Sequence, residues 1–220
     1  MNRVQKRITI GLWGLVVLAL VGLVAGKFLL AGRPGLPGHQ LMVQGSDDPG
    51  NQIAGALFDA PELKLTDQNG QPFSTSSLHG HPWIADFVFT TCGGICPVMS
   101  HQMASIQEHT PAGVNLVSFT VDPEHDSPPV LKAYGQALHA DFARWHFLTG
   151  TRKQMGNAEY GMKIAVQPAG PDTPIVHSDK FLLVDGAGKV VGVYDGTNAD
   201  DVKRLIAEAT RLAGGRGAAL

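Results

Sequence analysis

The stretch FTTCGGICPVMS, residues 89–100, contains both cysteines of the chain. Cys92 and Cys96 are separated by three residues, two of them glycines, and a proline follows directly. Proline is tolerated in the first turn of a helix and disfavours helical dihedrals in the residue before it. Cys96 is therefore expected at the entrance of a helix, with Cys92 in the loop before it. Such a pair suits a structural disulfide, a redox couple or a metal clamp.

The residues on either side of the motif predict a strand and a helix. Residues 83–89 are a nearly continuous apolar run, which is typical of a central buried strand. Residues 98–108 have helical spacing, with Met99, Met103 and Ile106 on one face. This shared face predicts core packing for the two methionines rather than metal binding. The two cysteines then lie at the carboxyl end of a strand, where open α/β sheets usually carry their sites.

The remainder of the chain alternates predicted strands with predicted helices. An Asn-Gly turn and a second glycine-containing turn predict two hairpins. The expected elements are a hairpin over 62–73, a strand over 114–121, helices over 129–138 and 152–160, a hairpin over 181–194, and a helix from Asn198 or Asp200 to about 213. Together they predict an α/β fold, a thioredoxin-like mixed sheet flanked by helices.

Length and charge restrict the classes of function. The chain has 220 residues, 44% of them hydrophobic, which is enough for one good core. Its formal net charge is -2, with no basic stripe and no acidic tail. This near balance argues against a nucleic-acid partner.

The N-terminus predicts a membrane anchor. Basic residues precede an apolar run from Ile8 to Gly26, long enough to cross a bilayer. We expect an anchor over 1–32, a Pro/Gly-rich tether over 33–55, a globular domain over 56–214 and a tail over 215–220. A cleaved signal peptide is the alternative for the first segment. In both cases the domain would work outside the cytoplasm, where disulfides can form.

A purely structural disulfide is the least favoured of the three interpretations of the cysteine pair. A disulfide across so short a loop would constrain the unfolded chain little. The N-terminus of a helix favours a thiolate over a thiol, and Gly93 and Gly94 would let the two sulfurs converge. Two soft thiolates suit Cu(I), or zinc if further ligands are present.

A third ligand is expected from histidine. The chain has nine histidines, and most are expected to be solvated or hydrogen-bonded locally. His177 is the exception, because it precedes the predicted strand 181–184, and in a thioredoxin-like sheet the segment entering that strand faces the cysteine motif. Asp122 and Asp126 are expected to cap the helix that begins near Pro129.

Three stretches in the same order resemble the Sco/SenC family of membrane-anchored copper-binding proteins. They are FVFTTCGGICP over 87–97, VSFTVDPEHDSP over 117–128 and VHSDKFLLVD over 176–185. Two features depart from the family pattern. Gly93-Gly94 replaces the Pro-Asp or similar pair often found between the cysteines, and Lys180 stands where an apolar residue is common.

The resemblance implies a thioredoxin-like domain that binds copper, as Cu(I) or Cu(II), through Cys92, Cys96 and His177. It further implies a role in assembling the dinuclear copper centre of cytochrome c oxidase, with the copper-accepting subunit or another copper chaperone as partner. The domain would lie on the periplasmic side of the inner membrane, held by a single span. The alternative is a thiol–disulfide oxidoreductase that keeps the acceptor's cysteines reduced; a peroxide-reducing enzyme is a weaker one.

Overall fold

A six-stranded mixed sheet organises the part of the chain that the computed structural model describes, residues 56–94, 96–167 and 175–214. The strand order is β1-β10-β9-β4-β5-β6, and the two remaining strand pairs are β2-β3 and β7-β8. The strands are β1 (Phe58–Asp59), β2 (Lys64–Thr66), β3 (Pro72–Ser74), β4 (Trp83–Val88), β5 (Asn115–Thr120), β6 (Trp145–Leu148), β7 (Val166–Gln167), β8 (Val176–His177), β9 (Lys180–Val184) and β10 (Lys189–Asp195). The helices are η1 (Thr75–Leu78), α2 (Cys96–His109), α3 (Pro128–Ala137), α4 (Arg152–Gly161) and α5 (Ala199–Gly214).

The centre of the sheet combines parallel and antiparallel pairing. β4 pairs with β5, and β5 with β6, in parallel, and the helices α2 and α3 provide the connections. β9 runs antiparallel to β4 on its other side, and the hairpin of β9 and β10 extends the sheet. The loop between β4 and α2 therefore opens at the carboxyl end of the central parallel strands, as the sequence predicts.

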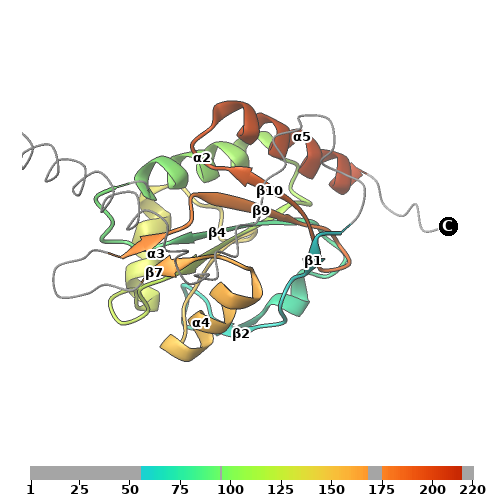
Figure 1. The fold of residues 1–220 in the computed structure, drawn as a ribbon. Helices are drawn as coiled ribbons and strands as arrows, with labels where there is room; N and C mark the ends of the chain where they lie inside the picture. The colour runs from blue at the N-terminus through green and yellow to red at the C-terminus, as the bar shows by residue number, and fades with distance from the viewer. Residues whose placement is uncertain (1–55, 95, 168–174, 215–220) are drawn as a thin grey trace, which may run out of the picture. The chain divides into compact units, whose positions relative to one another are not determined.

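Helices cover both faces of the sheet. Figure 1 shows α2 and α5 on one side of the sheet, with α4 and β2 on the other. Alternate residues of β4 divide between two apolar clusters, because successive side chains of a strand point to opposite faces. Ile84 joins the cluster built with α2, α3 and α5, and Phe87 joins the cluster built with α4 and the β2-β3 hairpin. The mixed α/β prediction is confirmed.

Local signals in the sequence account for several of the element boundaries. Gly70 and Gly188 have positive φ in the turns of the two predicted hairpins. Thr151 and Gln154 form a capping box at the start of α4, and the Asn198 side chain accepts hydrogen bonds from the first turn of α5. Of the two candidate caps for that last helix, Asn198 is the one observed.

β6 is a strand that the sequence analysis did not predict. It places His146 inside the edge strand of the sheet. The His146 ring is half-buried and packs against the ring of Phe73, with centroids 4.6 Å apart. Burial lowers the pKa of His146.

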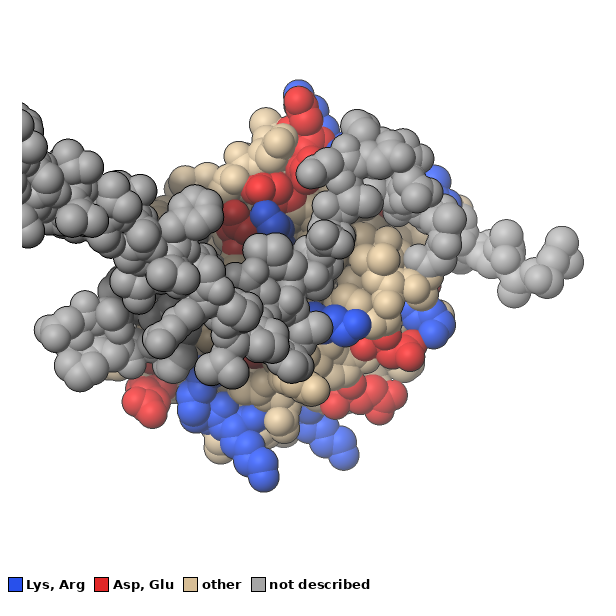
Figure 2. All heavy atoms as spheres, viewed as in Figure 1, with Lys and Arg blue, Asp and Glu red and all other residues tan. Residues whose placement is uncertain are grey.

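The predicted anchor, tether and tail lie outside the described residues. Within the described residues, no helix has the length and apolar character that a membrane crossing requires. Figure 2 shows acidic and basic side chains together on the visible face, with neither sign covering it alone.

Candidate metal centre

The two cysteines lie at the junction of β4 and α2. Cys92 is half-buried in the loop, where its backbone N–H donates to the carbonyl of Phe89 at 3.2 Å. Cys96 is the first residue of α2 and is buried. The two cysteines are not joined by a disulfide, and their side chains are within hydrogen-bonding reach of each other. The sequence prediction of one residue in the loop and one at the helix entrance is confirmed.

Burial sets the protonation of Cys96. It raises the pKa of the Cys96 thiol far above its ordinary value; the hydrogen bond with Cys92 and the nearby charge of Asp86 act in the same direction. A hydrogen bond with the backbone of Phe89 opposes the shift but does not cancel it. The expectation that the helix N-terminus favours a thiolate is therefore wrong for Cys96. Loss of solvation outweighs the helix dipole at a fully buried sulfur.

The two glycines of the motif are not required by the backbone. Neither Gly93 nor Gly94 has a positive φ, and a Cβ added at Gly93 would meet no atom within 4 Å. A Cβ at Gly94 would lie 3.9 Å from Sγ of Cys92, which is ordinary van der Waals contact. The two sulfurs do converge, as expected, but neither glycine adopts a left-handed backbone to allow it. The loop conformation is one that other residues can adopt.

His177 is placed by its backbone only. It belongs to β8 and lies opposite Val166 of β7 in an antiparallel pair. Its side chain is outside the described part of the structure. Within the described residues, no three side chains of the types that ligate metals form a cluster. The assignment of His177 as a ligand stays a prediction.

Other histidines and the methionines of α2 make local contacts. His109 accepts or donates at Ser105, its neighbour one turn earlier, and His125 pairs with Asp122, with 2.8 Å between Nδ1 and Oδ2. Met99 and Met103 are fully buried against the sheet, so their predicted role in the core is confirmed.

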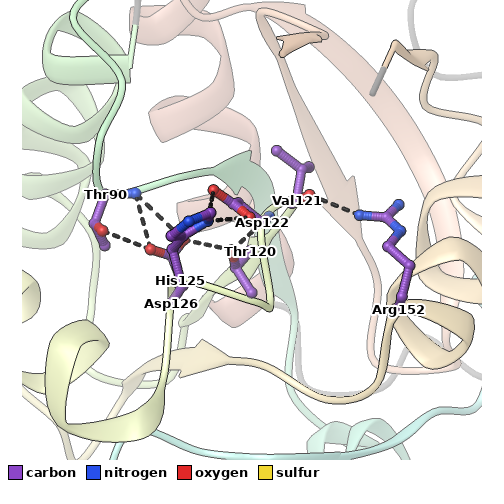
Figure 3. A network of polar contacts seen from close by, with 7 residues as sticks. All are labelled: Thr90, Thr120, Val121, Asp122, His125, Asp126 and Arg152. Carbon is purple, nitrogen blue, oxygen red and sulfur yellow. Dashed lines mark hydrogen bonds and ion pairs between the residues drawn. The ribbon is translucent and has the colours of Figure 1, made fainter. Parts of the chain in front are cut away.

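The acidic loop after β5 does not cap α3. Ser127 is the N-cap residue of α3, and no side chain closes that end. The Asp126 carboxylate turns the other way, to Thr90 and Thr120, as Figure 3 shows. Asp122 instead accepts from His125. The capping prediction is wrong because the Asp126 carboxylate instead accepts hydrogen bonds from the buried Thr120 hydroxyl and from the hydroxyl and backbone N–H of the half-buried Thr90.

A buried acid behind the cysteines escaped the sequence analysis. Asp86 of β4 is fully buried, on the face covered by α2. Desolvation raises its pKa to about 7. The signal was available in the sequence, because an aspartate inside an otherwise apolar strand must be buried with its neighbours.

Lys180 fits the strand register despite its charge. It is the first residue of β9 and lies opposite Asp195, the last residue of β10. Its Nζ is 2.9 Å from Oδ2 of Asp195 and 2.9 Å from Oδ1 of Asp179. These two ion pairs at the rim of the sheet account for a lysine where an apolar residue is common.

Comparison with known proteins shows which family the chain matches. The family model described as SCO1/SenC matches residues 54–214. The SCO1 protein homolog of Bacillus subtilis is 36% identical over 174 residues, which are 74% of this chain and 89% of that protein.

Two solved structures are similar in fold. BsSco, a member of the Sco family of cytochrome c oxidase assembly proteins in which a disulfide switch was identified, aligns with a TM-score of 0.65 at 31% identity. That alignment covers 75% of this chain and 99% of BsSco. Yeast Sco1 with copper bound aligns with a TM-score of 0.59 at 25% identity, over 74% of this chain and 92% of yeast Sco1. The thioredoxin-like architecture predicted from the sequence agrees with these structures.

Proposed function

Because the chain belongs to the SCO1/SenC family, we propose that it is a copper chaperone. Its cargo is copper, held by the sulfurs of Cys92 and Cys96 and by the imidazole of His177. Its recipient is the copper-accepting subunit of cytochrome c oxidase or another copper chaperone. The copper bound to yeast Sco1 and the assembly role of the family of BsSco support this proposal. The observation that carries it is the pair of neighbouring thiols where β4 meets α2.

The donor set fits the cargo. Thiolate sulfur is a soft ligand that suits Cu(I), and neutral imidazole is a good ligand for copper in either oxidation state. Cysteine binds a metal as the thiolate, so loading releases protons from the thiols. Exchange with a partner needs access to the site. The half-buried Cys92 and the exposed Gly93, Gly94 and Pro97 offer that access, whereas Cys96 is closed off by the core.

The second candidate function is thiol–disulfide exchange with a copper-accepting partner. It is favoured by one observation: Cys92 is the more exposed thiol, while Cys96 lies behind it as a resolving partner. Exchange requires one accessible sulfur to attack and a second to release the mixed disulfide. The spacing of three residues between the cysteines differs from the two of typical thioredoxins, which counts against a general disulfide reductase.

The location of the protein follows from the same proposal. The basic N-terminus and its long apolar run support a single-span anchor over residues 1–32, with the domain on the extracytoplasmic side. In that compartment the cysteine pair is exposed to oxidation. A chaperone of this design therefore needs a reducing partner to keep its two sulfurs available.

Copper titration of the full-length protein in detergent tests the function. Reduced protein competing with a Cu(I) chelator should bind about one equivalent, and Cys92→Ala, Cys96→Ala and His177→Ala should each weaken binding sharply. His101→Ala is the matched control, because His101 is exposed on α2. Unchanged affinity in His177→Ala would remove that residue from the ligand set. Steady turnover of a disulfide substrate by copper-free protein would favour the second function.

A further inference from the structure

The loop that carries Cys92 is hydrogen-bonded to another part of the fold near its start. Thr90 lies two residues before Cys92, just beyond the end of β4. Its backbone N–H points at the Asp126 carboxylate, 3.3 Å from Oδ1 and 3.2 Å from Oδ2, and its hydroxyl donates to Oδ1 at 2.5 Å. Figure 3 shows both contacts converging on the same side chain.

Asp126 joins this loop to the neighbouring strand. Its side chain is fully buried, and its Oδ2 also accepts from the Thr120 hydroxyl at 2.5 Å. Thr120 is the last residue of β5, level with Val88 of β4 in the parallel register. A buried carboxylate is costly unless donors surround it. Here one set of donors comes from the cysteine loop, through Thr90, and the other from the end of β5, through Thr120.

Further hydrogen bonds hold the segment that carries the Asp126 carboxylate. The Asp126 N–H donates to the carbonyl of Asp122 at 2.9 Å, and the Asp122 N–H donates to the Thr120 hydroxyl at 2.9 Å. From α4, Arg152 donates to the carbonyl of Val121 at 2.7 Å. Asp126 thus has its own supports outside the cysteine loop, and Thr90 is hydrogen-bonded to a residue that the segment after β5 holds in place.

We propose that Asp126 is the positioning residue of Cys92, and that its carboxylate, acting through Thr90, holds the Cys92 sulfur in place beside Cys96. The inference rests on the proposed use of the two cysteines. Groups that hold ligands in place contribute to metal affinity although they do not touch the metal. The same constraint raises the effective concentration of one sulfur at the other. Asp126 should thus influence both copper binding and disulfide formation.

A purely structural role for Asp126 predicts something different. If the residue served only to stabilise the start of α3, its loss would weaken the fold and leave the cysteines alone. Among the hydrogen bonds of the described residues, none joins the Asp126 carboxylate to the backbone of α3. The contacts lead to the cysteine loop. The test must therefore measure a property of the two cysteines, not only the stability of the fold.

The experiment compares Asp126→Asn with the wild type in two assays on the full-length protein. The first is Cu(I) affinity by chelator competition. The second, done without copper, is the equilibrium with glutathione disulfide. There the two protein thiols give up two electrons and two protons, the glutathione disulfide bond breaks, and a bond forms between Cys92 and Cys96 with release of two glutathione thiols. Asp126→Asn should weaken Cu(I) binding and disfavour the protein disulfide by roughly tenfold each.

Matched variants separate an effect on the position of Cys92 from an effect on the stability of the fold. Thr90→Val removes the hydroxyl that reaches Asp126 and should reproduce the direction of both changes, whereas Thr90→Ser keeps the hydroxyl and should restore wild-type values. Thr75→Val removes a buried hydroxyl at the start of η1, where it accepts from the backbone N–H of Leu63 and donates to the carbonyl of Pro61, so it lowers stability without touching the contacts of Asp126. It should leave both cysteine assays unchanged. If Asp126→Asn does not fold, Thr90→Val decides.

The outcomes are distinct. Unchanged copper affinity and unchanged disulfide equilibrium in folded Asp126→Asn would overturn the inference, and so would equal changes in Thr75→Val. If wild-type protein binds no Cu(I), the proposed function fails. A shifted disulfide equilibrium in Asp126→Asn and Thr90→Val would even then support Asp126 as the residue that positions Cys92.

Discussion

Asp86 and Ser118 lie directly opposite each other in the parallel pairing of β4 and β5, and both side chains are buried. The Ser118 hydroxyl accepts the indole N–H of Trp145 at 3.0 Å. Neither carboxylate oxygen of Asp86 reaches hydrogen-bonding geometry with a partner in the described part of the chain. The nearby hydroxyl only moderates the effect of desolvation, which raises the pKa of Asp86 to about 7. An acid in this position is a stability cost once it ionises.

The stability of the domain should fall with rising pH because of Asp86. Its pKa in the folded state, about 7, is above the ordinary value of 3.8. The folded state therefore retains a proton that the unfolded state loses, and this contribution is present below the unfolded pKa and lost as pH rises through about 7. Asp86→Asn should remove a stability difference on the order of 2 to 3 kcal/mol between about pH 5 and about pH 8. Urea unfolding of reduced, copper-free protein measures it.

The exposed Asp200 provides the control for that experiment. Asp200→Asn changes the same functional group on the surface and should leave the pH profile of the wild type almost unchanged. A wild-type profile parallel to that of Asp86→Asn would contradict the raised pKa of Asp86.

Two helical glycines should respond to alanine in opposite ways. A Cβ at Gly135 of α3 would lie 2.7 Å from ring atoms of Phe142 and Phe147, whereas a Cβ at Gly156 of α4 would meet no atom within 4 Å. Gly135→Ala should therefore cost about 1 to 3 kcal/mol of unfolding free energy. Gly156→Ala should add about 0.5 to 1 kcal/mol, because alanine loses less conformational entropy in a helix. Thermal unfolding of both variants checks the contrast; a stabilised Gly135→Ala would contradict the packing of α3.

The cysteine loop should tolerate alanine at Gly94. The added Cβ would make only ordinary contact with the Cys92 sulfur, at 3.9 Å. Gly94→Ala should keep Cu(I) affinity within about threefold of wild type, since the loop needs no left-handed backbone there. Gly188→Ala is the contrasting variant. Its φ is +79, and a Cβ would lie 3.0 Å from Nε2 of His79. It should lose about 1 kcal/mol or more of stability without affecting copper.

The sequence predicted the elements whose signals are local. The apolar run of β4, the helical spacing of Met99 and Met103, and the glycine turns of the hairpins each follow from neighbouring residues alone. β6 was missed because its four residues include His146 and become a strand only by pairing with β5. Short edge strands depend on a partner that is remote in sequence.

The sequence predicted where the two cysteines lie in the fold, but it did not predict the burial and the hydrogen bonds around them. Spacing and proline placed Cys92 and Cys96 correctly. The raised pKa of Cys96 depends on how completely the core closes over the sulfur, and this is a property of the packed fold. Asp126 was assigned to a helix cap because it precedes α3 in sequence. Its actual partner Thr90 is 36 residues away, so only the three-dimensional structure reveals it.

Oxidation of the cysteine pair should abolish tight copper binding. Thiolates bind the metal, and a disulfide between Cys92 and Cys96 removes both from the ligand set. The oxidised protein should therefore bind Cu(I) at least about 100-fold more weakly than the dithiol form, a larger effect than the loss of a supporting group. The measurement is chelator competition on protein oxidised with glutathione disulfide and freed of excess oxidant, before and after reduction. Reduction should restore the affinity fully. Equal affinity in the two redox states would mean that copper is held elsewhere, and both sulfurs would leave the proposed ligand set.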